Sequence, residues 1–168
     1  MVACVSTAGD LPSILRLDYV RGRKCREDVM VEGLKFHKVK IEDAPLRSLP
    51  MGRGTVFRCV DPSVGSSNVD VHVNVIKPGA SRGEIHYHAK AENVYIVMEG
   101  QLEVCIEGGQ RHVLEVGEVG FIPPGLVHTA TNARSDIVCK IVEVYAPAGK
   151  DFYEVDDWPE GVQPPEGD

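Results

Sequence analysis

Alternation of apolar and polar residues with a period of two is the feature that most constrains the fold of this chain. It recurs from residue 34 onward, together with enrichment in β-branched residues, and no apolar pattern of helical period extends over the length of a helix after that point. A period of two places alternate side chains on opposite faces of a strand, so that one face can be buried. The body of the chain is therefore predicted to be nearly all β.

Short turn-forming segments separate the predicted strands, among them DPSVGSS, KPGASRG, EGGQ and TNARSD. Many short strands at close, regular spacing are typical of a sandwich or a barrel. The predicted strands span residues 34–41, 54–60, 68–77, 84–88, 93–100, 102–107, 111–116, 117–123, 127–131 and 137–146.

The size and composition are those of one ordinary globular domain. The chain has 168 residues, of which 26% are charged and 43% are hydrophobic, and a domain of this length buries roughly 70% of its unfolded surface. No apolar run approaches the roughly 20 residues that would span a bilayer, and the N-terminus lacks the features of a secretory signal. We expect no membrane association, a cytoplasmic location, and a barrel at residues 31–150 between an N-terminal arm (1–30) and an acidic tail (151–168).

The charge distribution argues against a nucleic-acid partner. The net charge is -7, and seven of the 25 acidic residues, but no basic residue, lie in the segment 151–168. The rest of the chain is balanced, so it offers no excess of positive charge for phosphates. The five cysteines are widely spaced, and three of them stand in apolar strand-like runs, which predicts buried free thiols and not a disulfide framework.

Two histidines one residue apart occupy the predicted strand 84–88. Side chains at positions i and i+2 of a strand point the same way, so His86 and His88 share one face. Their imidazoles can converge on one metal ion, because metal–nitrogen bonds of about 2.0 to 2.1 Å come within reach when both rings tip inward. The alternative is that the two histidines only decorate a half-exposed strand.

A third histidine follows a tight turn in the segment GEVGFIPPGLVHTATN. Pro123 and Pro124 fix φ, and Gly125 can take a positive φ. This turn gives His128 a fixed position at the start of the next strand. Asn132 can hydrogen-bond to the backbone and hold the end of that strand.

These two segments resemble the motifs of the cupin superfamily. The first motif of that family is HxH, a Glu after three or four residues, and a Gly; the second is Gly, five residues, Pro-x-Gly, two residues, His, three residues, Asn. The matching residues here are His86, His88 and Gly100 in the first motif and Gly117, Pro123, Gly125, His128 and Asn132 in the second. The resemblance covers roughly residues 31–150. It implies a small jelly-roll barrel, a metal bound inside by the HxH pair, the Glu and the second-motif His, and a homodimer.

The chain departs from the family at the position of the Glu. Counting back from Gly100 puts this position at Asn93, whereas the nearest carboxylate, Glu92, lies one residue earlier. Regular alternation favours Asn93 as the inward residue, but a bulge at the start of the strand could bring Glu92 inward instead. Three histidines with a neutral amide would leave a divalent ion its full charge, which makes it a stronger Lewis acid that prefers an anionic ligand.

The expected protein is a cupin that holds one divalent metal ion, Fe, Mn, Ni or Zn, through His86, His88, Asn93 and His128. It would act on a small organic, anionic substrate by polarising a carbonyl oxygen or, with iron, by presenting dioxygen. Dioxygenase, isomerase and lyase chemistries all stay open, because the fold does not choose among them. The alternative is a non-catalytic small-molecule binder with a weakened or empty metal site.

Further side chains are expected near the cavity. Tyr95 shares the parity of Asn93, so it could donate a hydrogen bond to a substrate or serve as a general acid, or it could simply fill the barrel. Arg58 and Lys77 lie on strands that could flank the cavity and hold a substrate anion.

The remaining histidines, His37, His72 and His112, lie in or beside predicted strands without motif partners. They are predicted to be surface or packed residues, and we assign them no role.

Overall fold

The computed structural model describes residues 35–149 and 151–158, and the barrel belongs to a compact unit that begins at His37. The strands within the described residues are β1 (Leu46–Ser48), β2 (Gly54–Val60), β3 (Asp70–Ile76), β4 (His86–Tyr87), β5 (Glu92–Glu99), β6 (Leu102–Ile106), β7 (Gln110–Leu114), β8 (Val119–Ile122), β9 (His128–Asn132), β10 (Cys139–Ala146) and β11 (Tyr153–Glu154). The 3-10 helices are η1 (Ile41–Asp43), η2 (Pro50–Gly52) and η3 (Pro62–Val64). The prediction of a nearly all-β chain is confirmed.

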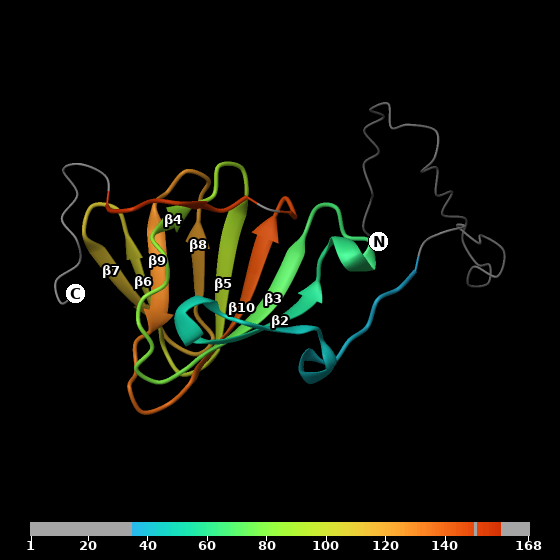
Figure 1. The fold of residues 1–168 in the computed structure, drawn as a ribbon, viewed down its shortest axis with the longest axis horizontal. Helices are drawn as coiled ribbons and strands as arrows, with labels where there is room; N and C mark the ends of the chain where they lie inside the picture. Colours follow the sequence, from blue (N-terminus) through green and yellow to red (C-terminus); the bar gives the residue numbers. More distant parts are fainter. Residues whose placement is uncertain (1–34, 150, 159–168) are drawn as a thin grey trace, which may run out of the picture. The chain divides into compact units, whose positions relative to one another are not determined.

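The strands form two antiparallel sheets, shown in Figure 1, that enclose the core of a jelly-roll barrel. The first sheet has the order β1-β2-β3-β10-β5-β8, and the second has the order β11-β4-β9-β6-β7. Neighbours in these sheets are often far apart in the sequence, since β10 lies between β3 and β5. The predicted fold class, a small jelly-roll barrel, is confirmed.

The predicted strands agree with the structure except at the ends of the barrel. The strand predicted at residues 34–41 is wrong for its described part, because residues 35–40 form no strand and Ile41 begins η1. Val39 and Ile41 instead pack on the outer apolar cluster that includes Val73, so burial and not strand pairing accounts for their apolar character. The short strands β1 and β11 were not predicted. The predicted division into arm, barrel and tail stays a prediction, and residues 1–30 lie outside the described residues.

Cross-strand register places a polar row on the inner face of the first sheet. Arg58 of β2 is the partner of His72 in β3, which faces Glu143 of β10, which in turn faces Tyr95 of β5. Because residues opposite one another in a sheet point to the same side, these four side chains line up across four strands.

The other end of the barrel interior is apolar. Its buried cluster is formed by Ile76, Tyr95, Val97, Leu102, Val104, Leu114, Ile122, Cys139 and Ile141. Burial of these side chains is the main contribution to the stability of the barrel. The polar row and the apolar cluster meet at Tyr95, which belongs to both.

Asn132 ties together three segments at the end of β9. Its Nδ2 donates to the carbonyls of Ile76 (3.3 Å), Lys77 (3.1 Å) and Ile137 (2.7 Å), and its Oδ1 accepts from the N–H of Arg134 (2.9 Å). The predicted hydrogen bonding to backbone is confirmed.

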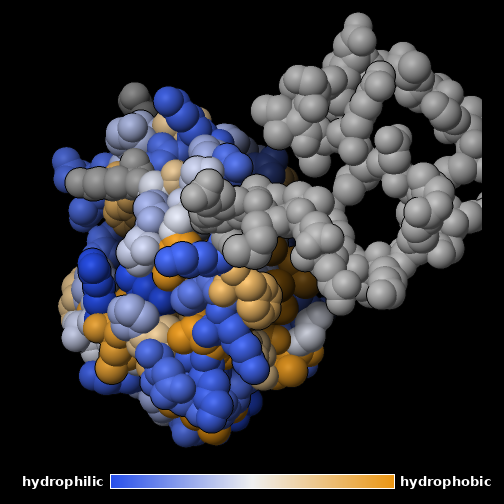
Figure 2. Space-filling model, turned by 90° about the vertical axis from the view of Figure 1, so that its right-hand side faces the viewer, coloured by the Kyte–Doolittle hydropathy of each residue, from blue (hydrophilic) through white to orange (hydrophobic). Residues whose placement is uncertain are grey.

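The surface is mixed in character. In Figure 2, hydrophilic and hydrophobic residues are interspersed on the face of the barrel that is not covered by grey atoms. Among the described residues there is no helix with the length and apolar character needed to cross a membrane.

Gly100, at the end of β5, lies where two backbones approach closely. Its φ is 72°, and a Cβ added there would lie 2.2 Å from the carbonyl oxygen of Val138. Gly125 has a similar φ of 85°, but an added Cβ would have open space around it. The first-motif glycine is thus required for space as well as for conformation.

We expect Gly100→Ala to lower the free energy of unfolding more than Gly125→Ala does. A non-glycine residue in the left-handed region costs about 1–2 kcal/mol, and only Gly100→Ala adds a clash with backbone. Urea unfolding of the two metal-free variants and the wild type measures both losses. Equal losses would contradict the close approach at Gly100.

Candidate functional site

Three histidines meet inside the barrel. His86 in β4 is the cross-strand partner of His128 in β9, and His88 follows two residues after His86. The ring of His86 has its centroid 4.3 Å from that of His128 and 5.0 Å from that of His88. All three side chains are buried, and one ring nitrogen of each lies within 4.8 Å of the others. The structure thus brings together the three histidines that the motifs single out.

Backbone carbonyls fix the tautomer of two of these rings. Nδ1 of His86 donates to the carbonyl of Glu84, and Nδ1 of His128 donates to the carbonyl of Leu126, each over 2.9 Å. Because a carbonyl can only accept, Nδ1 carries the proton and Nε2 keeps its lone pair. Ligation through Nε2 requires this arrangement.

The Nε2 atoms of His86 and His128 are buried and have no hydrogen-bond partner among the described residues. Burial, with His128 close by, lowers the pKa of His86 to about 3, and burial also lowers the pKa of His128. Both rings are therefore neutral at neutral pH. A buried acceptor without a partner costs about 1–3 kcal/mol, and a cation between the rings would satisfy both atoms. The three-histidine set fits a metal ion.

The turn before β9 fixes His128 relative to His88. The N–H of Gly125 donates to the carbonyl of His88 over 2.7 Å, and the N–H of Leu126 donates to the carbonyl of Pro123 over 3.3 Å. The predicted role of this turn in positioning His128 follows from these bonds.

The C-terminal segment closes the site from a direction that the sequence did not suggest. Nδ1 of His88 hydrogen-bonds to the carbonyl of Asp151. The carboxylate of Asp151 accepts from the backbone N–H groups of Ala89 (3.2 Å), Lys90 (2.8 Å) and Ala91 (2.7 Å). Burial alone would raise the pKa of Asp151, but these bonds lower it overall. Asp151 therefore holds the loop that follows His88.

Phe152 lies directly on the histidine cluster. Its ring stacks on that of His86 with centroids 4.0 Å apart and an interplanar angle of 18°. Figure 1 shows this segment, in red, running across one end of the barrel. Two residues that we had assigned to an acidic tail thus contribute to the site.

Asn93 faces the cluster and Glu92 does not. Asn93 is fully buried, whereas Glu92 is exposed, so the alternation that favoured Asn93 as the inward residue is confirmed and no bulge reverses it. Nδ2 of Asn93 lies 3.5 Å from Nε2 of His88, 3.2 Å from the hydroxyl of Tyr95 and 3.1 Å from Oε1 of Glu143. The amide nitrogen is therefore the atom turned to His88, and Oδ1 is buried without a partner among the described residues. Asn93 as a metal ligand stays a prediction.

Glu143 is a buried carboxylate that the sequence reading missed. Its Oε1 accepts from Asn93 and from the hydroxyl of Tyr145 (2.6 Å), and its Oε2 accepts from Nδ2 of Asn74 (2.5 Å). A signal was present in the run IVCKIVEVYA, where Glu143 shares the parity of the buried Ile141. Negative charge thus lies one strand away from the place where the family has its Glu.

The hydroxyl of Tyr145 donates to Glu143 over 2.6 Å, and the hydroxyl of Tyr95 accepts from Nδ2 of Asn93 over 3.2 Å. Burial raises the pKa of each well above its usual value, and the nearby Glu143 raises it further. Their hydroxyls therefore stay protonated at neutral pH, which suits donation to a ligand and not proton abstraction. The catalytic role of Tyr95 stays a prediction.

Two hollows open beside the histidines. A cleft of about 580 Å³ is lined by His72 and His88, and a second of about 420 Å³ is lined by His86, Tyr95 and Glu143. Tyr145 and Phe152 contribute to both. Volumes of this size hold small organic molecules.

The basic residues near the hollows differ from those expected. Arg58 lines the larger cleft but is bound to acidic partners, and Lys77 is exposed with its Nζ on the carbonyl of Gly52. Sequence reading missed Arg53, a buried side chain in the smaller hollow, and Arg47, an exposed side chain lining the larger one.

The remaining histidines lie apart from the cluster. His112 is exposed, and Nε2 of His37 hydrogen-bonds to the carbonyl of Cys59 over 3.0 Å. His72 is buried on the inner face and contacts Asp70.

Known proteins share this sequence pattern and fold. Residues 72–145 match the protein-family model described as Cupin domain. An uncharacterized protein of Aquifex aeolicus (strain VF5) is 33% identical over 73 residues, which cover 42% of this chain and 58% of that protein. The chain thus spans little more than half the length of this curated relative.

Solved structures agree on the fold. The polyketide cyclase RemF of Streptomyces resistomycificus superposes with a TM-score of 0.63 at 18% identity, over 75% of this chain and 89% of that one. A sugar phosphate isomerase of the cupin superfamily from Silicibacter pomeroyi gives a TM-score of 0.60 at 19% identity, over 76% and 90% of the two chains. Residues 72–145 thus match a cupin domain, and the solved structures share its jelly-roll fold.

Proposed function

We propose that this chain is a metal-dependent cupin enzyme that binds one divalent metal ion through His86, His88 and His128 and acts on a small anionic organic molecule. The observation that carries the proposal is the pair of buried Nε2 atoms, on His86 and His128, that have no partner among the described residues. In a binder with a retired site, the rings would be expected to pair through these atoms with each other or with backbone.

The ligand set suits a transition metal. Neutral imidazoles bind Fe, Ni and Zn well, and Mn is also accepted when oxygen ligands complete the site. When bound, such an ion would polarise an oxygen of the substrate and stabilise negative charge on it. The side chains around it supply the other functions.

Positive charge on the protein favours an anionic substrate. Arg47 lines the cleft that His88 also lines, and it makes no ion pair within the described residues. Arg53 lines the inner hollow with two of its guanidinium nitrogens held by the carbonyls of Ser81 (2.8 Å) and Ala130 (2.6 Å). We assign the recognition of a substrate carboxylate or phosphate to these arginines.

The tyrosines would orient the substrate. Tyr95 and Tyr145 stay protonated next to Glu143, so each can donate a hydrogen bond. Their place in the hollow that His86 lines puts both donors next to the proposed ion. Tyr95 thereby becomes a positioning or proton-donating group.

A homodimer and a reducing compartment complete the proposal. The outward-facing side chains of β5 and β8 form an apolar strip, since Ile96, Met98, Val119 and Phe121 are all exposed, and a second copy could cover it. Cys59, Cys105 and Cys139 are buried free thiols, which fits the cytoplasm.

Purified wild-type protein should contain close to one equivalent of a divalent transition metal per chain, and His88→Ala should lose it. His112→Ala removes an exposed histidine away from the cluster and should keep the metal. Elemental analysis by mass spectrometry measures the three ratios. Wild-type protein that is free of metal and also refuses added ions would leave the non-catalytic binder as the remaining reading.

Asn93→Glu should tighten metal binding by about tenfold or more, because it adds an anionic ligand beside His88. The same change should destabilise the metal-free protein, because the new carboxylate would lie next to that of Glu143. Asn93→Gln has the same length without the charge and serves as the control. Metal titration followed by calorimetry, with thermal unfolding of the metal-free proteins, separates the effects; equal affinity in both variants would show that residue 93 does not act on the metal.

By light scattering, the wild type should have twice the molar mass of one chain, and the Phe121→Glu variant should have the molar mass of a single chain. The charge would be placed on the apolar strip of β5 and β8, where a second copy would have to bury it. A monomeric wild type at micromolar concentration would remove the dimer from the proposal.

A further inference from the structure

We propose that His72, held by Asp70, is the group that moves a proton on the substrate at the three-histidine centre, and that the reaction is accordingly a proton transfer at carbon next to a carbonyl. The identity of the reaction rests on the proposed function; the arrangement of His72 and Asp70 does not. This inference gives a role to a histidine that the sequence left without one.

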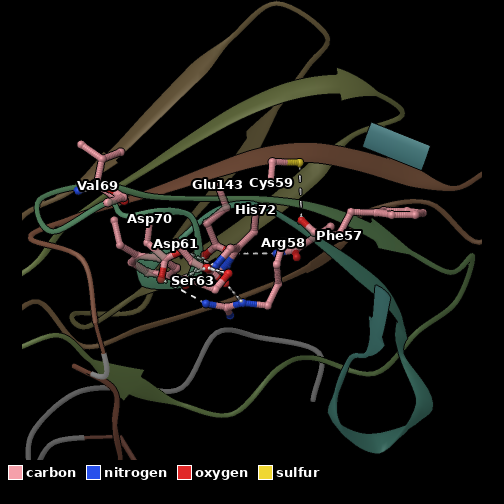
Figure 3. A network of polar contacts seen from close by, with 12 residues as sticks. Phe57, Arg58, Cys59, Asp61, Ser63, Val69, Asp70, His72 and Glu143 are labelled. Carbon is pink, nitrogen blue, oxygen red and sulfur yellow. Dashed lines mark hydrogen bonds and ion pairs between the residues drawn. The ribbon is translucent and has the colours of Figure 1, made fainter. Parts of the chain in front are cut away.

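His72 and Asp70 form a buried pair on the inner face of β3. Nε2 of His72 lies 2.7 Å from Oδ1 of Asp70, and both residues are buried, with 11% of the His72 side chain and 6% of the Asp70 side chain exposed. Figure 3 shows the two side chains within one network of polar contacts. A carboxylate only accepts, so Nε2 of His72 carries a proton and donates it to Asp70.

Arg58 fixes the other side of the carboxylate. Its Nη2 donates to Oδ2 of Asp70 over 3.2 Å, and its Nε donates to Oδ2 of Asp61 over 2.9 Å. Hydrogen bonds from Ser63 and from Arg58 lower the pKa of Asp61 to about 2, so Asp61 stays ionised and holds the guanidinium. Asp70 is thereby kept in one orientation next to a cation.

The second ring nitrogen of His72 is available. Nδ1 forms no hydrogen bond within the described residues. It is absent from the fully buried atoms that lack a partner there, so it is in reach of the cleft. His72 lines the cleft of about 580 Å³. In the tautomer set by Asp70, this nitrogen holds a lone pair that can accept a proton from a molecule in the cleft.

The cleft is shared with the candidate metal centre. His88 lines it too, and Tyr145 contacts both rings, with centroids 5.6 Å from His72 and 4.8 Å from His88. A small molecule bound in this cleft next to His88 would therefore be separated from His72 only by the ring of Tyr145. Arg47 lines the same cleft and suits an anionic substrate group.

Charged groups face His72 from its own strand and from both neighbouring strands. Across the sheet it faces Arg58 on β2 and Glu143 on β10, and Asp70 contacts it on its own strand. Two carboxylates and one guanidinium therefore lie around the His72 ring. Tyr145 beside it stays protonated, so it does not compete for the proton.

The step balances without an oxidant. The C–H bond next to a carbonyl breaks, its proton goes to Nδ1 of His72, and its electron pair forms a carbon–carbon double bond while the carbonyl electron pair moves to oxygen. Return of the proton to the same carbon gives exchange or, from the opposite face, epimerisation. Where that carbon carries a hydroxyl, return of the proton to the former carbonyl carbon completes an isomerisation, and the hydroxyl proton passes to the carbonyl oxygen. This arrangement suits isomerase or lyase chemistry, in which a proton leaves one carbon and is later returned.

The tautomer can be tested without metal or substrate. Nitrogen-15 NMR of histidine-labelled, metal-free protein, with the His72 signals identified by their loss in His72→Gln, should show Nε2 protonated and Nδ1 not. Asp70→Asn should shift the ring toward a mixture of tautomers. A ring protonated at Nδ1, or one indifferent to Asp70→Asn, would overturn the pairing that the proposal needs.

The reaction can be tested with pyruvate and 2-oxobutyrate as probes. Metal-loaded wild type in deuterium oxide should exchange the protons next to the carbonyl, seen by proton NMR, and His72→Gln should slow this by about 100-fold or more at unchanged metal content. His112→Gln is the matched control and should match the wild type. Equal exchange by His72→Gln, or none by a metal-loaded wild type, overturns the proton-transfer assignment while the metal site stands. Protein that takes up no metal refutes the proposed function instead. The NMR measurement of the His72 tautomer then tests the His72–Asp70 pair by itself.

Discussion

The pairing of β3, β10 and β5 in one register is the constraint on which the site depends. Because antiparallel partners on the same face form rows, His72, Glu143 and Tyr95 meet across three strands, and Tyr145 meets Asn93 in the row beside them. A slip of β10 by one residue would turn Glu143 and Tyr145 to the outer face. Asn93 would then lose the acceptor that orients its amide, and His72 would lose one of the two carboxylates that face it.

Polar groups inside the barrel are mostly satisfied by one another, and the exceptions gather at the site. Glu143 accepts from three side chains, and Asp70 is held by His72 and Arg58. The buried side-chain atoms left unpaired within the described residues belong to two asparagines and two histidines of the inner face. Since an unpaired buried polar group is costly, their concentration next to the hollows indicates a place that a ligand completes.

Short-range patterns predicted the part of the site that is built locally. His86 and His88 share a strand face, and His128 follows its own turn. Spacing singled out these residues, and the resemblance to the cupin motifs joined them into one metal set. Glu143 and Arg53 were missed because each enters the site from a segment distant in sequence, and no local spacing links them to the histidines. The strand predicted near residue 39 was wrong for a related reason, since Val39 is apolar to cover the outer face of the sheet and not to pair.

The sequence by itself determined the all-β class, and it favoured an inward Asn93 and a meeting of three histidines, because alternation and tight turns act over a few residues. Only the tertiary structure decided which strands are neighbours, and with that the carboxylate beside Asn93, the pairing of His72 with an anchored Asp70, and the closure of the site by Phe152. Neighbours in a jelly roll are chosen by closure of the whole barrel around its core. That choice depends on contacts between residues far apart in the chain, which no local pattern records.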